Sequence, residues 1–191
     1  MAENRSSEEA FMSNQYRLVG RHAYESIRLT SEIDPPRKNV KIFNRNVDVI
    51  KNAPLVGFIY NRRADIDKEM IDPETKKPYD YSVMEQQMYY AHKELMFNFR
   101  IIMLLDKDYE PDGEKRVDKG MKHFAEDKAD QERFEQYLRG GIDVLYEKLI
   151  KENNPRTPEE YLSNVFEFVS DFHDSFYATI DKEDLLERLR K

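Results

Sequence analysis

The chain has 191 residues, of which 39% are hydrophobic and 36% charged, enough for one folded domain with a real core and a very polar surface. It contains no cysteine, which excludes a disulfide framework, a thiolate metal site and a cysteine nucleophile. The formal net charge of −7 argues against indiscriminate coating of nucleic acid or membranes, although a local patch can still be basic.

Two further features favour a cytoplasmic protein without a membrane segment. The first ten residues are polar and acidic, so they lack the apolar core of a signal peptide. The longest mostly apolar run, residues 95–105, is shorter than the roughly 20 residues that a bilayer requires, and it contains Asn98 and Arg100.

The first expected element is a long N-terminal helix over residues 1–34. Ser6 and Glu9 have the spacing of a capping box, which satisfies free amides at a helix start. The helix should end near Ile33, because the following Asp34-Pro35-Pro36 cannot continue it. Apolar residues recur along it at helical steps, at Met12, Tyr16, Val19, Ala23 and Ile27.

Residues 35–63 form a basic segment. It contains seven Lys or Arg and one acid, Asp48, a net +6 that leaves −13 for the rest of the chain. Apolar spacing predicts a helix inside it, from about residue 46 to residue 60, with Pro54 tolerable only near the start or at a break. Residues 65–81 are polar, contain Pro73 and Pro78, and are expected to be an exposed loop.

A further helix is expected after this loop. Ser82 is its candidate cap, with Glu85 three residues later. Over residues 95–105 the sequence is apolar nearly all round, which marks a central buried helix; a buried strand in the second half is the alternative, and the length favours a helix. The helical stripe comprises Met88, Ala91, Leu95, Phe99 and Ile102. An acidic turn and a short helix over residues 117–124 follow.

Residues 131–150 give the clearest amphipathic helix. Its stripe is interrupted near the middle by Gly140-Gly141, and glycine in a helix interior costs about 1 kcal/mol relative to alanine. Either another backbone packs closely against the pair, or the helix breaks there into two pieces. The stripe consists of Phe134, Leu138, Ile142, Leu145 and Leu149.

The C-terminal part, residues 156–191, is expected to be a pair of helices packed on the core. Thr157, Pro158 and Glu160 form a strong helix start, and an aromatic stripe runs behind them. Asp181 is expected to cap a last short helix that carries three leucines. With residues 1–34 as the N-terminal helix and 35–155 as the helical core, the prediction is a mainly α, single-domain bundle of about six helices.

The basic segment is the main candidate site. Cations placed along one surface release counterions from nucleic acid on binding, so the segment is a candidate DNA contact. The alternative is that these cations balance the protein's own acids or meet an acidic partner. The candidate DNA-binding residues are Arg37, Lys38, Lys41, Arg45, Lys51, Arg62 and Arg63.

Other motifs point to no catalytic residue, metal or cofactor. Residues 108–113 resemble half a calcium loop, but its twelfth position is Lys119 instead of a bidentate glutamate. A metal-dependent enzyme that uses His173 with Asp171 or Asp174 is a minority hypothesis. Tyr89-Tyr90 and the aromatic series over residues 161–177 could stack on bases, but their spacing favours the core and helix interfaces.

Three blocks in order carry a family resemblance. The first block comprises residues 40–43, 48–50 and 55–58 and ends at Asn61-Arg62-Arg63. The second block is residues 98–105. The third is residues 134–137, followed by Gly140-Gly141 and an apolar stretch to residue 145. Together they resemble accessory proteins encoded beside DNA phosphorothioation (Dnd) systems and similar bacterial defence islands. The resemblance covers roughly residues 40–150 and brings no catalytic residues with it.

The resemblance implies a role in anti-phage defence. We therefore expect a non-enzymatic accessory or adaptor subunit that contacts DNA through the basic segment and docks a larger nuclease or ATPase subunit; oligomerisation is left open. The alternative is a protein-binding regulator or immunity-type inhibitor whose acidic surface mimics nucleic acid. In that case charge reversal at Glu126, Asp127 and Asp130 should disable it.

Overall fold

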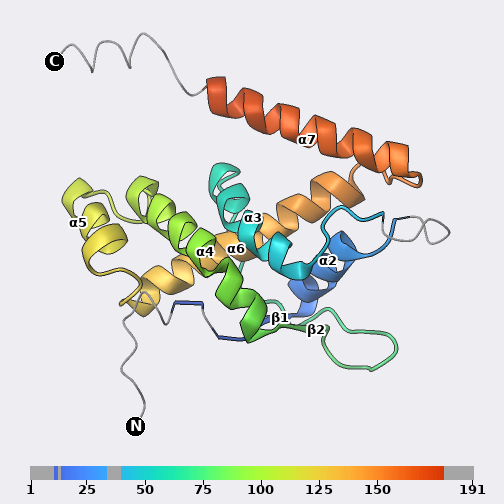
Figure 1. Cartoon of the computed structure of the whole chain (residues 1–191), viewed down its shortest axis with the longest axis horizontal. Helices are drawn as coiled ribbons and strands as arrows, with labels where there is room; N and C mark the ends of the chain where they lie inside the picture. Colours follow the sequence, from blue (N-terminus) through green and yellow to red (C-terminus); the bar gives the residue numbers. More distant parts are fainter. Residues whose placement is uncertain (1–10, 13, 34–39, 179–191) are drawn as a thin grey trace.

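The computed structural model describes residues 11–12, 14–33 and 40–178, with the side chains of 175–178 left aside. In this part of the chain the fold is mainly α and forms a single domain, with six α-helices and one small sheet of two strands (Figure 1). The predicted fold class is confirmed. The start of the first helix at Ser6, residues 34–39 and the last helix from Asp181 lie outside the described residues.

The N-terminal region differs from the prediction of one long helix. Strand β1 (Tyr16–Val19) pairs antiparallel with β2 (Asp80–Val83), and helix α2 begins only at Gly20 and ends at Thr30. Gly20 has φ +58° and donates its amide to the carbonyl of Tyr79 at 2.7 Å, so the chain turns there from strand to helix. Glycine adopts this left-handed conformation without steric cost.

Helices α3 (Asn46–Ile59) and α6 (Lys128–Tyr146) cross at the centre of the molecule (Figure 1). The predicted apolar stripe of α6 is buried, and the helix runs unbroken through Gly140 and Gly141. Of the two alternatives for the glycine pair, a close backbone contact is therefore the one observed. A π-helical turn, η2 (Glu147–Lys151), follows α6.

Pro54 lies well inside α3, which corrects the expectation that it marks a start or a break. Proline has no amide proton for the helical bond to the carbonyl of residue i−4, and its ring crowds that turn. The amide of Asn98, on α4, donates to the neighbouring carbonyl of Lys51 at 2.7 Å. A buried side chain of another helix thus bonds the backbone beside the proline.

Helix α4 (Glu85–Leu105) is helical throughout, as predicted, and its five-residue stripe is buried. Two details of the prediction were wrong. Ser82 belongs to β2, and the residue that precedes α4 is Met84, whose side chain makes no capping hydrogen bond. Phe97, Tyr89 and Tyr90 are exposed, so α4 buries one face only and the tyrosine pair is not part of the core.

Two elements connect α4 to α6, and helix α7 follows η2. Helix α5 (Gly113–Val117), capped by Asp112, and the π-helical turn η1 (Asp118–Lys122) occupy the place of the short helix predicted over residues 117–124. Helix α7 (Pro158–Ala178) begins at the predicted start, and the residues there form a capping box: Glu160 donates its amide to the Thr157 hydroxyl, and its carboxylate accepts the amide of Thr157.

Candidate functional site

The basic segment does not form one patch. Arg45 immediately precedes α3 and Lys51 lies on its second turn, whereas Arg62 and Arg63 follow its C-terminal end. A helix of 14 residues is about 21 Å long, so the two groups lie at opposite ends of α3. Lys41 precedes α3 and is half-buried; Arg37 and Lys38 lie outside the described residues.

The group at the N-terminal end of α3 is balanced by carboxylates. Arg45 forms an ion pair with Asp48 at 3.1 Å, and Lys51 lies 3.7 Å from the same carboxylate. Lys51 also lies 3.9 Å from Glu94 on α4. At this end of the helix the cations therefore offset the protein's own acids, which is the alternative to a DNA contact.

The C-terminal end of α3 is shaped by its glycines and by Asn61. Asn61 has φ 48°, which ends the helix; its amide donates to Phe58, and the amide of Arg62 donates to the carbonyl of Gly57 at 2.8 Å. This is the bond pattern of a Schellman motif, in which a left-handed residue closes the last helical turn. We call residues 61–64 the arginine corner.

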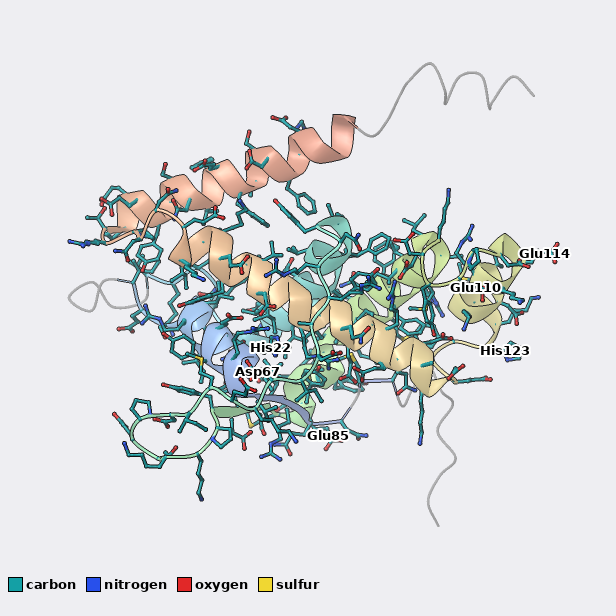
Figure 2. The ribbon with its side chains drawn as sticks, turned by 180° about the vertical axis from the view of Figure 1, so that it is seen from behind. His22, Asp67, Glu85, Glu110, Glu114 and His123 are labelled. Carbon is teal, nitrogen blue, oxygen red and sulfur yellow. The ribbon has the colours of Figure 1, made fainter. Side chains whose placement is uncertain are left out.

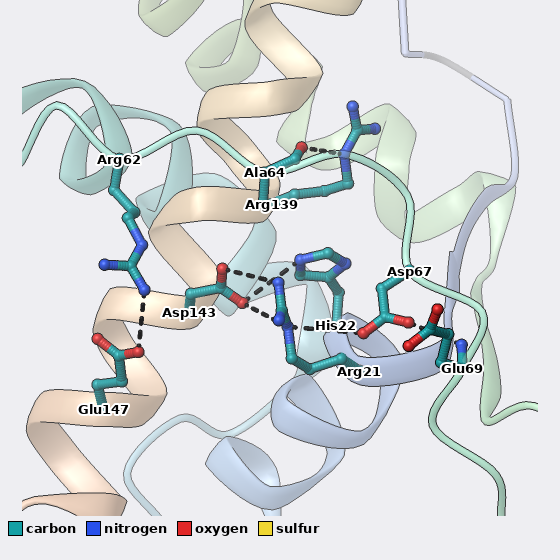
Figure 3. A network of polar contacts seen from close by, with 9 residues as sticks. All are labelled: Arg21, His22, Arg62, Ala64, Asp67, Glu69, Arg139, Asp143 and Glu147. Carbon is teal, nitrogen blue, oxygen red and sulfur yellow. Dashed lines mark hydrogen bonds and ion pairs between the residues drawn. The ribbon is translucent and has the colours of Figure 1, made fainter.

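The arginine corner is fixed against α6 by backbone contacts. A Cβ on Gly140 would overlap the carbonyl of Arg62 and would lie 2.8 Å from the amide nitrogen of Arg63. The amide of Ala64 donates to the carbonyl of Gln136 at 3.0 Å, and the guanidinium of Arg139 donates to the carbonyl of Ala64 at 2.8 Å (Figure 3). Gly140 is therefore the residue that lets the two arginines sit here.

Both arginine side chains of this corner are exposed. Arg62 forms an ion pair with Glu147 at 3.1 Å, between two partly exposed groups (Figure 3). The guanidinium of Arg63 lies 5.9 Å from the ring centre of Tyr137, and no carboxylate of a described residue lies within ion-pair distance of it. Arg63 is thus available to an external anion.

Two adjoining surface hollows meet at the corner. One has a volume of about 790 Å³ and the other about 480 Å³, and residues 62–65 line both. The first also exposes Arg21, Lys68 and several carboxylates, and the second exposes Arg133. The lining is mixed in charge, so the paired arginines, rather than the hollows as a whole, give the corner its positive character.

The larger hollow ends on a partly buried polar network, formed by Arg21 and His22 of α2, Asp67 of the loop and Asp143 of α6 (Figure 3). Glu25 of α2 also belongs to it, because it is buried and interacts with Asp143. Arg21 lies 3.2 Å from the Asp143 carboxylate and 3.8 Å from Asp67, and His22 Nε2 lies 3.4 Å from Asp143. We call this set the Asp143 network. It joins α2 to α6 and to the loop.

Burial and the neighbouring Asp143 carboxylate raise the pKa of Glu25 well above its ordinary value. Burial of Asp143 acts in the same direction, but the close His22 and Glu25 side chains and the charge of Arg21 lower its pKa. The network therefore holds Asp143 as the anion and Glu25 as the neutral acid. His22 is buried and does not line the hollow, so the His22–Asp143 pair is placed to link helices rather than to meet a substrate.

The histidines and carboxylates that could bind a metal do not gather. His22 and Asp67 lie in the middle of the molecule, while Glu110, Glu114 and His123 lie at the end that carries α5 (Figure 2). His173 is exposed on α7, 3.3 Å from Asp174. Within residues 11–12, 14–33 and 40–178, no group of three His, Asp or Glu side chains could hold a metal ion.

Sequence reasoning identified Arg62 and Arg63 but missed Arg21, Lys68 and Asp143 as their neighbours. The sequence carries one signal of this site, the glycine pair at residues 140–141, for which a close backbone contact was one of two predicted alternatives and is the one observed. No helix among the described residues has the length and apolarity needed to cross a membrane. Comparison with protein-family models, curated proteins and solved structures gives no match, so the site is interpreted from its own geometry.

Proposed function

We propose that this protein is a non-enzymatic accessory subunit of a bacterial anti-phage defence system, which contacts DNA through the arginine corner and docks a larger nuclease or ATPase subunit. The family resemblance over residues 40–150 supports the defence role, and it includes α3, the corner and the glycine pair. The DNA contact is narrowed to the pair Arg62 and Arg63, because Arg63 has no carboxylate partner among the described residues and Arg62 has one, whereas Arg45 and Lys51 share Asp48 and Lys51 also lies near Glu94.

The observation that carries this proposal is the presentation of two consecutive exposed arginines by a rigid backbone. The corner is bonded to both α3 and α6, so little conformational freedom remains to be lost on binding. A guanidinium matches a phosphate in a two-pronged geometry. The Arg62–Glu147 pair is partly exposed and worth about 0 to 1 kcal/mol, so a phosphate can replace Glu147.

Fluorescence anisotropy of a labelled duplex and a labelled single strand, measured between about 50 and 200 mM salt, tests the contact. The double variant Arg62→Gln/Arg63→Gln should weaken binding and lower the log–log salt slope by about two, one for each phosphate that is no longer neutralised. Glu147→Gln should strengthen binding, since it removes the competing carboxylate of Arg62.

A matched control lies at the other end of the same helix. The double variant Arg45→Gln/Lys51→Gln removes the same two charges from residues that already have acidic partners, and it should leave DNA affinity nearly unchanged. An equal loss in both double variants would show a nonspecific charge effect, and absence of binding at low salt would remove the DNA contact from the proposal.

The second candidate, a protein-binding regulator, is favoured by one feature of α7. Its 21 residues include five acids and neither lysine nor arginine. The acids of residues 126–130 are less suitable for a charge-reversal test, because Asp130 is buried and bonded to Lys119, and Asp127 caps α6. Reversal at the exposed Glu167 and Asp171 would disable an acidic binding surface and leave DNA affinity intact.

A further inference from the structure

Helix α7 is fixed to the rest of the protein along one face. The buried amide of Asn164 donates to the carbonyls of Leu149 at 3.4 Å and Glu152 at 3.3 Å. The ring of Phe168 stacks on Tyr60 of the α3 end, with centroids 6.1 Å apart and planes 11° from parallel. Because of these contacts, the orientation of the next face of α7 is set by the fold.

That next face is apolar and exposed. Leu162, Phe166 and Val169 recur at steps of four and three, which places them on one stripe of the helix. Their exposed fractions are 55%, 68% and 56%. Single exposed apolar residues are ordinary, but three in a row on one helix mark an interaction surface. Helix α7 runs along the edge of the molecule, where a partner could approach it (Figure 1).

Helix α7 as a whole is acidic. The exposed acids of α7 carry its only formal charges at neutral pH, since the helix contains no lysine or arginine. One of them, Glu160, belongs to the capping box, and the others are spread along the helix. They are Glu159, Glu160, Glu167, Asp171 and Asp174.

This charge pattern selects the occupant. A second copy that presented the same helix would bring together two helices with five acids each and no lysine or arginine, and this repulsion of like charges costs binding energy. The chain's own residues 179–191 contain four acids and four bases, so they carry no net charge to match α7. A helix with an apolar stripe flanked by lysines or arginines complements both the apolar residues and the acids.

We infer that the Leu162–Phe166–Val169 face of α7 is a docking site for a basic amphipathic helix of a partner protein. Three anchors at these steps are what a helix laid against another helix engages. Glu159, three residues before Leu162 on the same side of α7, would pair with a flanking cation of the partner, and the other acids of the helix add longer-range attraction. The inference names the chemistry of the docking partner and so rests on the docking part of the proposed function. It does not involve the arginine corner.

A labelled peptide of about 18 residues, made of leucine and lysine with leucines at helical spacing, serves as the probe. It should bind the full chain, as followed by fluorescence anisotropy, and the affinity should fall with salt. Phe166→Ser and Leu162→Ser should each weaken binding by about tenfold or more, because they remove central anchors. Glu167→Gln/Asp171→Asn should weaken it and reduce its salt dependence.

Three controls accompany this titration. Tyr89→Ser changes an equally exposed aromatic residue on α4 and should leave peptide affinity unchanged. A peptide with the same composition in scrambled order should bind weakly, because it lacks the apolar stripe. Arg62→Gln/Arg63→Gln should bind the peptide normally, and Phe166→Ser should bind DNA normally, so failure of the docking site and failure of the DNA contact are distinguishable.

Four results would overturn the inference. The first is equal binding of the scrambled peptide, and the second is peptide binding that Phe166→Ser does not weaken. The third and fourth assign another occupant to this face of α7. A concentration-dependent dimer in sedimentation that Phe166→Ser abolishes would identify a second copy. Stronger peptide binding by the variant Leu185→Ser/Leu186→Ser would identify the chain's own C-terminal segment as the occupant.

Discussion

Gly141 of α6 lies directly against Ala53 of α3, at the point where the two helices cross. A Cβ built on Gly141 would overlap the carbonyl of Ala53 and would lie 2.9 Å from the amide nitrogen of Gly57. Gly57 is in the reciprocal position, since its own Cβ would overlap the carbonyl of Tyr137. The cost of glycine inside a helix is offset here by the contact of two backbones, which no other residue would permit.

Gly141→Ala should therefore destabilise the protein, although alanine favours a helix by about 1 kcal/mol. The added methyl group meets backbone atoms that can move only if the two helices separate, so we expect stability to fall by about 3 kcal/mol or more. Chemical denaturation monitored by circular dichroism measures it. Gly113→Ala is the control: its new Cβ would meet only the Arg116 side chain, at 3.5 Å, and should change stability by about 0.5 kcal/mol at most.

The bond from Asn98 to the Lys51 carbonyl should contribute measurably to stability, because both groups lie in the packed region around Pro54. We expect Asn98→Ala to cost about 1 to 3 kcal/mol in unfolding free energy. Asn52→Ala removes a similar bond, from a side-chain amide to the carbonyl of Asp48, at an exposed site. That variant should be destabilised by about 0.5 kcal/mol or less. Similar effects in the two variants would contradict a special role for Asn98.

Two Arg–Asp pairs of the protein should differ in strength because one is buried. Asp106 accepts from Arg133 at 2.8 Å and from the hydroxyl of Tyr137 at 2.9 Å, and it is 3% exposed. Removing its charge leaves the Arg133 cation without its partner, so Asp106→Asn should cost about 3 kcal/mol. Asp80→Asn breaks the exposed pair with Arg17 and should cost less than about 1 kcal/mol. Thermal unfolding of both variants compares them.

Glu25 should make the protein less stable as pH rises. Its pKa is raised in the folded state, so between its ordinary value of 4.5 and the raised one the folded protein holds a proton that the unfolded chain releases. Stability gained from this group is complete below about pH 4.5 and is lost as pH rises, by up to about 1.4 kcal/mol per unit. Asp143 acts oppositely: its lowered pKa adds stability above its ordinary value that is lost in acid.

Glu25→Gln tests this sign, because the amide can still donate to Asp143 but cannot titrate. Unfolding free energies measured by urea titration from about pH 5 to about pH 9 should fall in the unmodified protein and stay flatter in the variant. Arg21, His22, Asp143 and Glu147 face or influence the same site, and all are retained. Parallel curves for the two proteins would refute the assignment of Glu25 as a neutral acid.

Local sequence signals predicted much of the helical structure. The apolar stripes of residues 88–102 and 134–149 are buried on α4 and α6. This was predictable because an apolar stripe with helical spacing packs its helix against the core. The start of α7 was also predictable, because the capping box of Thr157 and Glu160 is a contact between residues three apart. Such contacts depend on nothing outside the segment.

The N-terminal strand was not predicted, because its partner lies more than sixty residues away. Tyr16 pairs with Val83, and four-residue strands carry too little pattern to compete with a helical period in the same residues. Gly20 was the available signal, since a glycine with positive φ separates the strand from α2. Likewise, the width of the apolar stripe on α7 suggested burial, yet the fold covers only one side of it.

Most helix spans, the cap of α7 and the charge of residues 35–63 follow from the amino-acid sequence without the fold. For Gly140-Gly141 the sequence alone left two alternatives, a close backbone contact or a break in the helix. The backbone atoms that the glycines contact cannot be read from the sequence. The separation of the candidate cations into two groups at the two ends of α3 cannot be read from it either. Which side of α7 faces outward is likewise a property of the folded chain. The physical reason is the range of the interactions: caps and periodicity act within a few residues, whereas packing and ion pairing join residues that only folding brings together.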